Sequence, residues 1–171
     1  MLRGLTHITQ PLSGEYEERI FDIESNWNSS DWSWIRFEED DKIWVGEFRG
    51  KFRRASFSEK LGIIVVLTAD YLYILDLETK KFTDYERMPQ YCDITYTPLG
   101  DILMTDGYRL VVFKEKDIST LKNIVLPVNA DSLRFIGYDG NTLIMQCEEL
   151  LNCDHAVRLF MDCASFDIQA E

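Results

Sequence analysis

The sequence predicts a mainly β protein built from antiparallel hairpins, and three observations lead to this prediction. Short apolar runs recur along the 171 residues, and acidic or glycine-containing turns separate them. The runs are rich in β-branched and aromatic residues, which is typical of strands. Two of the turns are Asp-Gly pairs, whose two positions tolerate the positive φ angles of tight hairpins.

Four hairpins follow from this pattern, joined by polar connectors such as residues 78–90 and 114–123. We expect a two-sheet sandwich or a strongly bent meander. Because hairpins and connectors alternate, a small β-propeller-like arrangement is the alternative. Its four blades of about 40 residues would use nearly the whole chain. The predicted turns are Glu38–Asp41, Ala69-Asp70, Asp106-Gly107 and Asp139-Gly140.

One segment near the start favours a short helix, and we expect at most two such helices. Tyr16, Ile20, Ile23 and Trp27 are spaced for one helical face, with Ser13 as the N-cap. The same residues also alternate as a strand would. Near the end, residues 155–168 alternate in the manner of a last strand.

The chain length and the absence of a linker predict a single domain over residues 1–171. A globule of this size buries roughly 70% of the surface that its unfolded chain exposes, so its core needs neither metal nor disulfides. The prolines fall between the apolar runs, as loop residues do.

The charge of the chain argues against two classes of partner and favours a third. A formal net charge of −12 disfavours binding to nucleic acid or to an anionic membrane. It favours encounter with a basic protein. The stretch from Phe48 to Lys60 is locally basic, and we interpret it as a strand edge where positive charge blocks further pairing.

The sequence has no apolar run typical of a signal peptide or a membrane helix, so we expect a cytoplasmic location. In that compartment the four cysteines are expected to be reduced thiols.

All four tryptophans lie between Ser25 and Phe48, which makes this hairpin the main candidate site. A three-residue turn, Glu39–Asp41, would pair Arg36 with Trp44 and gather the aromatic residues on one face. A two-residue turn would change that division, because a shift of one residue moves every side chain to the other face.

We interpret the aromatic face as a partner-binding surface, because interface centres favour aromatic residues and arginine. The adjacent acidic turn would steer a basic partner. The alternative is that the face is ordinary core, with Trp27 as part of its cover. The candidate partner-binding residues are Trp32, Trp34, Arg36, Asp40, Asp41, Trp44 and Phe48.

Catalytic and metal chemistry find little support in the sequence. The only histidines are His7 and His155. Cys153 and His155 are flanked by Cys147 and Cys163, but these spacings are unlike the closely paired ligands of structural zinc. We therefore expect no metal, no cofactor and no catalytic residue.

The sequence favours a non-catalytic protein-binding module, such as an inhibitor or immunity-type protein that binds a basic partner. The alternative is a small-ligand or carbohydrate-binding β-domain, or a carboxylate-based hydrolase, because acidic residues are plentiful enough for a catalytic pair.

Overall fold

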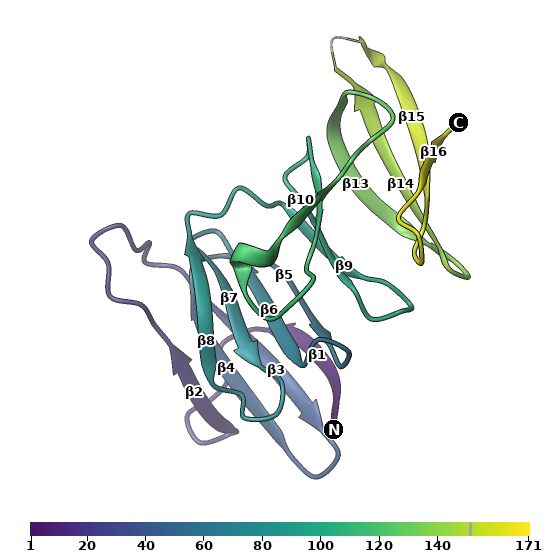
Figure 1. Ribbon diagram of the computed structural model, residues 1–171. Coiled ribbons are helices and arrows are strands. Elements are labelled where there is room, and N and C mark those ends of the chain that lie inside the picture. Colours follow the sequence, from purple (N-terminus) through teal and green to yellow (C-terminus); the bar gives the residue numbers. More distant parts are fainter. Residues whose placement is uncertain (151) are drawn as a thin grey trace. The chain divides into compact units, whose positions relative to one another are not determined.

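The computed structural model describes residues 1–150 and 152–171, and for residues 152–155 it describes the backbone alone. In these described residues, sixteen strands form four sheets of four strands each (Figure 1). The only helical element in the described part is a 3₁₀ turn, η1 (Ile118–Thr120), and no helix there is long and apolar enough to cross a bilayer. The prediction of a mainly β, largely antiparallel protein is confirmed.

The first sheet has the strand order β1-β3-β4-β2. Its central hairpin is antiparallel, and β2 pairs in parallel with β4. The helix predicted around Tyr16 to Trp27 is therefore wrong, because residues 17–21 form the strand β2. In this strand Phe21 packs against the ring of Phe48, whereas Ile20 is exposed. The strands are β1 (Leu2–Ile8), β2 (Glu17–Phe21), β3 (Trp32–Glu39) and β4 (Ile43–Arg49).

The second sheet has the order β5-β6-β7-β8. Every residue of β6 is buried, as its continuous apolar sequence requires. The basic stretch forms the edge strand β5, as interpreted from its charge. One predicted polar connector instead contains β8. The strands are β5 (Phe52–Ser58), β6 (Ile63–Thr68), β7 (Tyr71–Asp76) and β8 (Phe82–Arg87).

The third sheet is an antiparallel meander with the order β12-β11-β10-β9. Its central strand β10 is buried throughout. The second polar connector contains η1 and the short strand β12. The strands are β9 (Asp93–Tyr96), β10 (Ile102–Thr105), β11 (Leu110–Val112) and β12 (Lys122–Ile124).

The fourth sheet is also an antiparallel meander, with the order β13-β14-β15-β16. The strand predicted in the tail is β15, and a further short strand follows it. The strands are β13 (Ala130–Asp139), β14 (Thr142–Glu149), β15 (Asn152–Asp162) and β16 (Ile168–Ala170).

All four predicted hairpins are present, at β3–β4, β6–β7, β10–β11 and β13–β14. Each belongs to a different four-stranded sheet. This succession of four small sheets fits the small β-propeller-like arrangement, which is the alternative fold that the sequence predicts.

By its internal contacts the chain divides into two compact units. Unit 1 comprises Met1–Ala55 and Ile64–Pro89, and unit 2 comprises Ser56–Ile63 and Gln90–Glu171. The core of unit 1 includes Phe37, Trp44, Phe48 and Tyr73, each fully buried.

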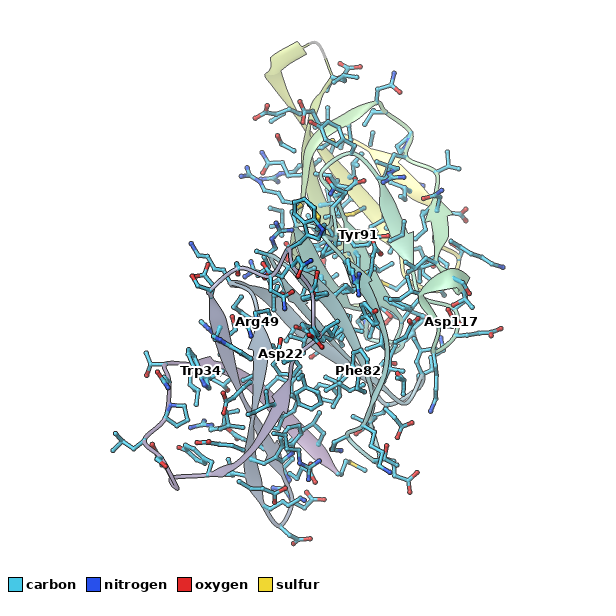
Figure 2. The ribbon with its side chains drawn as sticks, turned by 90° about the vertical axis from the view of Figure 1, so that its left-hand side faces the viewer. Asp22, Trp34, Arg49, Phe82, Tyr91 and Asp117 are labelled. Carbon is cyan, nitrogen blue, oxygen red and sulfur yellow. The ribbon has the colours of Figure 1, made fainter. Side chains whose placement is uncertain are left out.

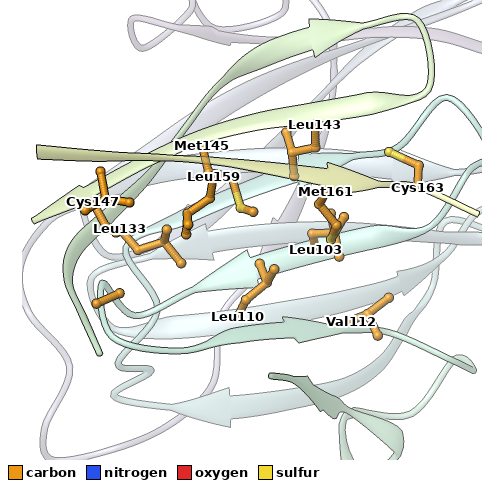
Figure 3. Packing of buried hydrophobic residues seen from close by; sticks show 12 residues of the cluster. Leu103, Leu110, Val112, Leu133, Leu143, Met145, Cys147, Leu159, Met161 and Cys163 are labelled. Atoms are coloured by element: carbon orange, nitrogen blue, oxygen red, sulfur yellow. The ribbon is translucent and has the colours of Figure 1, made fainter. Parts of the chain in front are cut away.

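The core of unit 2 lies between its two meanders. Figure 3 shows Leu103, Leu110 and Val112 of the third sheet facing apolar side chains of the fourth. Cys147 and Cys163 belong to this cluster, and burial raises the pKa of both thiols. They pack there as small apolar side chains.

Candidate interaction surface

The β3–β4 hairpin closes through a two-residue turn, the length at which the sequence does not gather the aromatic residues on one face. The amide of Glu39 donates to the carbonyl of Lys42 over 2.9 Å, which leaves Asp40 and Asp41 as the turn. Arg36 consequently pairs with Val45, and Phe37 pairs with Trp44. The predicted aromatic face is thereby divided between the two sides of the sheet.

Two of the seven candidate residues, Trp44 and Phe48, belong to the core of unit 1. The ring of Trp44 stacks on Phe37 with 3.8 Å between centroids, and its Nε1 donates to Glu39 over 2.9 Å. Phe48 stacks on Phe21 at 4.7 Å. Neither side chain is accessible, so the prediction that they share an exposed face with Trp32 and Trp34 is wrong.

Trp32, Trp34 and Arg36 lie together on the opposite face of β3, where all three are half-buried. The guanidinium of Arg49 lies 3.8 Å above the ring of Trp32. The same guanidinium donates two hydrogen bonds to Asp22, of 2.7 and 3.1 Å (Figure 2). These bonds hold the pKa of Asp22 below its ordinary value.

The acidic turn lies at the other end of the hairpin from Trp32. The strand between them has eight residues, about 25 Å of extended chain. Asp40 binds the amino terminus and the Arg3 guanidinium, and these two groups lower its pKa. Its charge is therefore largely compensated, whereas Asp41 is exposed.

Trp34 has an acidic environment. It pairs across the hairpin with Glu47, and its indole favours the ionised form of that carboxyl group. Glu18 of β2 lies on the same face, close enough for its charge to act on Glu47. Desolvation and the neighbouring Glu18 charge raise the pKa of Glu47, and the Trp34 indole only partly opposes them.

The most exposed tryptophan is Trp27, whose side chain is 83% accessible. It lies in residues 22–31, named here the Trp27 loop, which join β2 to β3. Asn28 anchors this loop: its Nδ2 donates to the carbonyl of Ile23 over 2.6 Å, and its Oδ1 accepts from the Tyr71 hydroxyl.

Further anchors follow along the Trp27 loop. The amide of Ser29 donates to Asp70 over 2.8 Å, and the amide of Gly50 donates to the carbonyl of Asp31 over 2.8 Å. The loop is thus hydrogen-bonded to β7, to the β6–β7 turn and to the end of β4. Because the loop is already ordered by these bonds, its backbone loses little conformational entropy when a partner covers the exposed indole.

A hollow of about 190 Å³ opens beside Trp27. Met88 lies on its rim, 66% exposed, with a φ angle of +49° and with its amide donating to the carbonyl of Asp70. A second, shallower hollow adjoins the first at Ser25 and contains Glu24 and Asn28. The first hollow is lined by Ser25, Trp27, Asp70, Tyr71, Arg87 and Met88.

Sequence reasoning assigned Trp27 to a helix face or to a cover over the other tryptophans, and neither assignment is correct. The signal that could have revealed its exposure is local. Trp27 stands between two asparagines and among serines, which favour turns through side-chain hydrogen bonds to the backbone. Met88 carried no signal, because its position depends on contacts with a turn distant in the sequence.

The metal hypothesis has no geometric support in the described residues. No three His, Cys, Asp or Glu side chains gather there in a way that could hold a metal ion. In the described part of the chain, Cys92, Cys147 and Cys163 form no disulfide bond. The side chains of Cys153 and His155, which prompted the hypothesis, lie outside the described part.

The fold and this surface together define a mainly β protein with an exposed aromatic loop. No protein-family description and no curated protein matches its sequence. Among solved structures the N-terminal domain of Nup159 is similar, with 10% identity and a TM-score of 0.47 over 71% of this chain. The similarity covers 34% of that chain.

Proposed function

We propose that the protein is a non-catalytic protein-binding module and that the Trp27 loop is its contact surface. The observation that carries the proposal is the 83% exposed indole of Trp27 on a hydrogen-bonded loop, next to the exposed Met88. Tryptophan and methionine are enriched at protein interfaces, and tryptophan is among the commonest binding hot spots.

The partner that suits this surface is a basic protein. A net charge of −12 attracts such a partner and accelerates its encounter with the chain. An inhibitor or immunity-type role would consist in covering the functional surface of that partner. Trp34 and Arg36 on the outer face of β3 stay predicted contacts, as do Asp40 and Asp41 in the turn. Trp32 would act indirectly by holding Arg49 against the loop.

Photo-crosslinking tests whether the loop binds a protein. A photo-reactive amino acid at position 26, beside an intact Trp27, is expected to form protein adducts in an extract of the native source. The same probe in a Trp27→Ala chain should form few of them. A probe at position 125 of unit 2, where the native valine is 87% exposed, serves as the matched control.

Equal adducts in the Trp27 and Trp27→Ala chains would contradict the proposal. The captured protein then allows direct measurement of binding, in which Trp34→Ala tests the originally predicted hairpin. Loss of the partner's own activity in the complex would support the inhibitor role.

One observation favours a second candidate function, a small-ligand or carbohydrate site or a carboxylate-based hydrolase. Glu18 and Glu47 form a carboxylate pair beside the indole of Trp34, and the pKa of Glu47 is raised. Aromatic side chains stack on sugar rings, and paired carboxylates hydrolyse glycosides. Oligosaccharide binding that disappears in Glu47→Gln and persists in Trp27→Ala would favour this candidate.

A further inference from the structure

The Trp27 loop carries uncompensated negative charge on both sides of the indole. The loop contains three acidic residues, Asp22, Glu24 and Asp31, and no basic residue. Arg49 compensates Asp22. Glu24 and Asp31 are exposed, and the described residues give neither carboxylate a hydrogen bond or an ion pair.

The base that shares the hollow with the indole is already engaged with another ring. Arg87 lines the hollow, but its guanidinium lies over the ring of Tyr85 at 5.6 Å and donates to the Tyr85 hydroxyl over 3.3 Å. The face of Trp27 and the carboxylate of Glu24 are thus open to an external cation.

The protein itself shows how these groups hold a guanidinium. Arg49 lies 3.8 Å above Trp32 and forms two hydrogen bonds with Asp22. An indole supplies the cation–π attraction, and a carboxylate supplies the forked hydrogen bonds that only arginine can complete. Trp27 and Glu24 present the same two chemical groups to solvent.

The size of the adjoining hollow indicates what accompanies the arginine. Its volume of about 190 Å³ is below the roughly 300–1,000 Å³ of sites for drug-sized ligands. It is large enough for one side chain. Its lining of Trp27, Tyr71 and Met88 favours an apolar side chain.

We propose that the Trp27 loop recognises an arginine of the basic partner, with the guanidinium over the Trp27 indole and against Glu24, while an apolar residue next to that arginine enters the hollow beside Met88. This inference rests on the proposed protein-binding function. It adds the chemistry of the recognised segment.

Short peptides and the full chain provide the test. The probe is an arginine–leucine–arginine tripeptide within a glycine–serine frame, and its comparison peptides carry lysine or glutamate for arginine, or alanine for leucine. Calorimetry should show binding of the arginine–leucine peptide, weaker binding of the lysine and alanine peptides, and none of the glutamate peptide. Emission of the exposed Trp27 should shift to the blue on binding.

Two substitutions locate the peptide. Trp27→Ala should weaken binding by at least about tenfold, the usual effect of removing an anchor. Glu24→Gln should also weaken it, and more so at low salt, because exposed charges are screened as ionic strength rises. Val125→Ala, at an exposed position of unit 2, is the control and should leave binding unchanged.

The outcomes separate this inference from the proposed function. Equal binding of the lysine and arginine peptides, or unchanged binding by Trp27→Ala, would overturn the inference. So would a blue shift caused by a neutral oligosaccharide and by no peptide. Trp27-dependent protein adducts from position 26 would leave the proposed function standing in each case. Absence of those adducts would overturn both.

Discussion

At the scale of single residues, the tryptophans of this chain have three different environments. Trp44 is core, Trp32 and Trp34 are half-buried on the outer face of a sheet, and Trp27 is exposed. Their proximity in the sequence therefore says little about a shared role. The difference is measurable as stability.

We predict that Trp44→Ala lowers the free energy of unfolding by about 3–5 kcal/mol, because it removes a fully buried ring and leaves a cavity. Trp27→Ala should change it by less than about 0.5 kcal/mol, as exposed substitutions do. Urea denaturation followed by circular dichroism gives both values. A destabilisation by Trp27→Ala as large as that by Trp44→Ala would show that the loop is structural.

A second prediction concerns Glu47 and pH. A carboxyl group whose pKa is raised by folding stabilises the fold while it is protonated, and this contribution is lost as the pH rises through the folded pKa. Glu47→Gln should therefore be more stable than the parent at neutral pH, with a flatter pH dependence above the ordinary range of a glutamate. Urea denaturation at several pH values between about 4 and 7 measures this slope.

Glu18→Gln is the matched variant, because it removes the neighbouring charge and keeps the burial of Glu47. It should show a smaller gain of the same sign. A parent protein whose stability does not fall between the ordinary and the raised pKa would contradict the raised pKa of Glu47.

At the scale of elements, one glycine fixes the junction between β4 and the strand that follows it. Gly50 has a φ angle of +97°, and a Cβ there would lie 2.7 Å from the Thr68 hydroxyl and 2.8 Å from the backbone nitrogen of Asp70. Its carbonyl accepts from the Ser33 hydroxyl over 2.6 Å. This junction supports the turn that anchors the Trp27 loop.

We predict that Gly50→Ala destabilises the protein by more than about 2 kcal/mol, because backbone strain and a steric clash add. Gly140→Ala is the control: the φ angle is +56°, but no atom lies within 4 Å of the new Cβ. It should lower stability by only about 1–2 kcal/mol. Thermal or urea unfolding distinguishes the two, and equal effects would argue against the clash.

Elements with a strong local signal could be predicted from the sequence. The buried strands β6 and β10 are short apolar runs, and the Asp-Gly turns follow from backbone geometry alone. The short strands β8, β12 and β16 were missed because their residues are largely polar or exposed and their pairing is decided by tertiary contacts. The parallel pairing of β2 had no local signal.

The candidate site shows a sharper limit. Whether the turn at Asp40 has two or three residues decides which face every aromatic side chain occupies. Nothing in four consecutive acidic residues, Glu38 to Asp41, distinguishes the two lengths. The choice depends on the packing of Phe37, Trp44 and Phe48, which only the folded sheet reveals.

At the scale of the whole molecule, the predicted single domain requires that the two compact units unfold together. All four tryptophans belong to unit 1, so tryptophan emission reports on that unit alone, whereas far-ultraviolet circular dichroism reports on all four sheets. We predict that the two urea transitions coincide, as they do in two-state unfolding. An emission transition displaced from the dichroism transition would instead indicate two domains.

The path of the chain through the two units has a consequence for dissecting the protein. Residues Ser56–Ile63 belong to unit 2, although unit 1 precedes and follows them. Within unit 2, Lys60 of this segment forms an ion pair of 2.7 Å with Asp101. The hydroxyl of Ser58 donates a hydrogen bond to the carbonyl of Gly100. A protease that cuts once after Pro89 would therefore separate unit 2 from one of its own segments. No single cleavage or truncation can yield both units with all their residues, and a fragment that begins at Gln90 lacks this octapeptide.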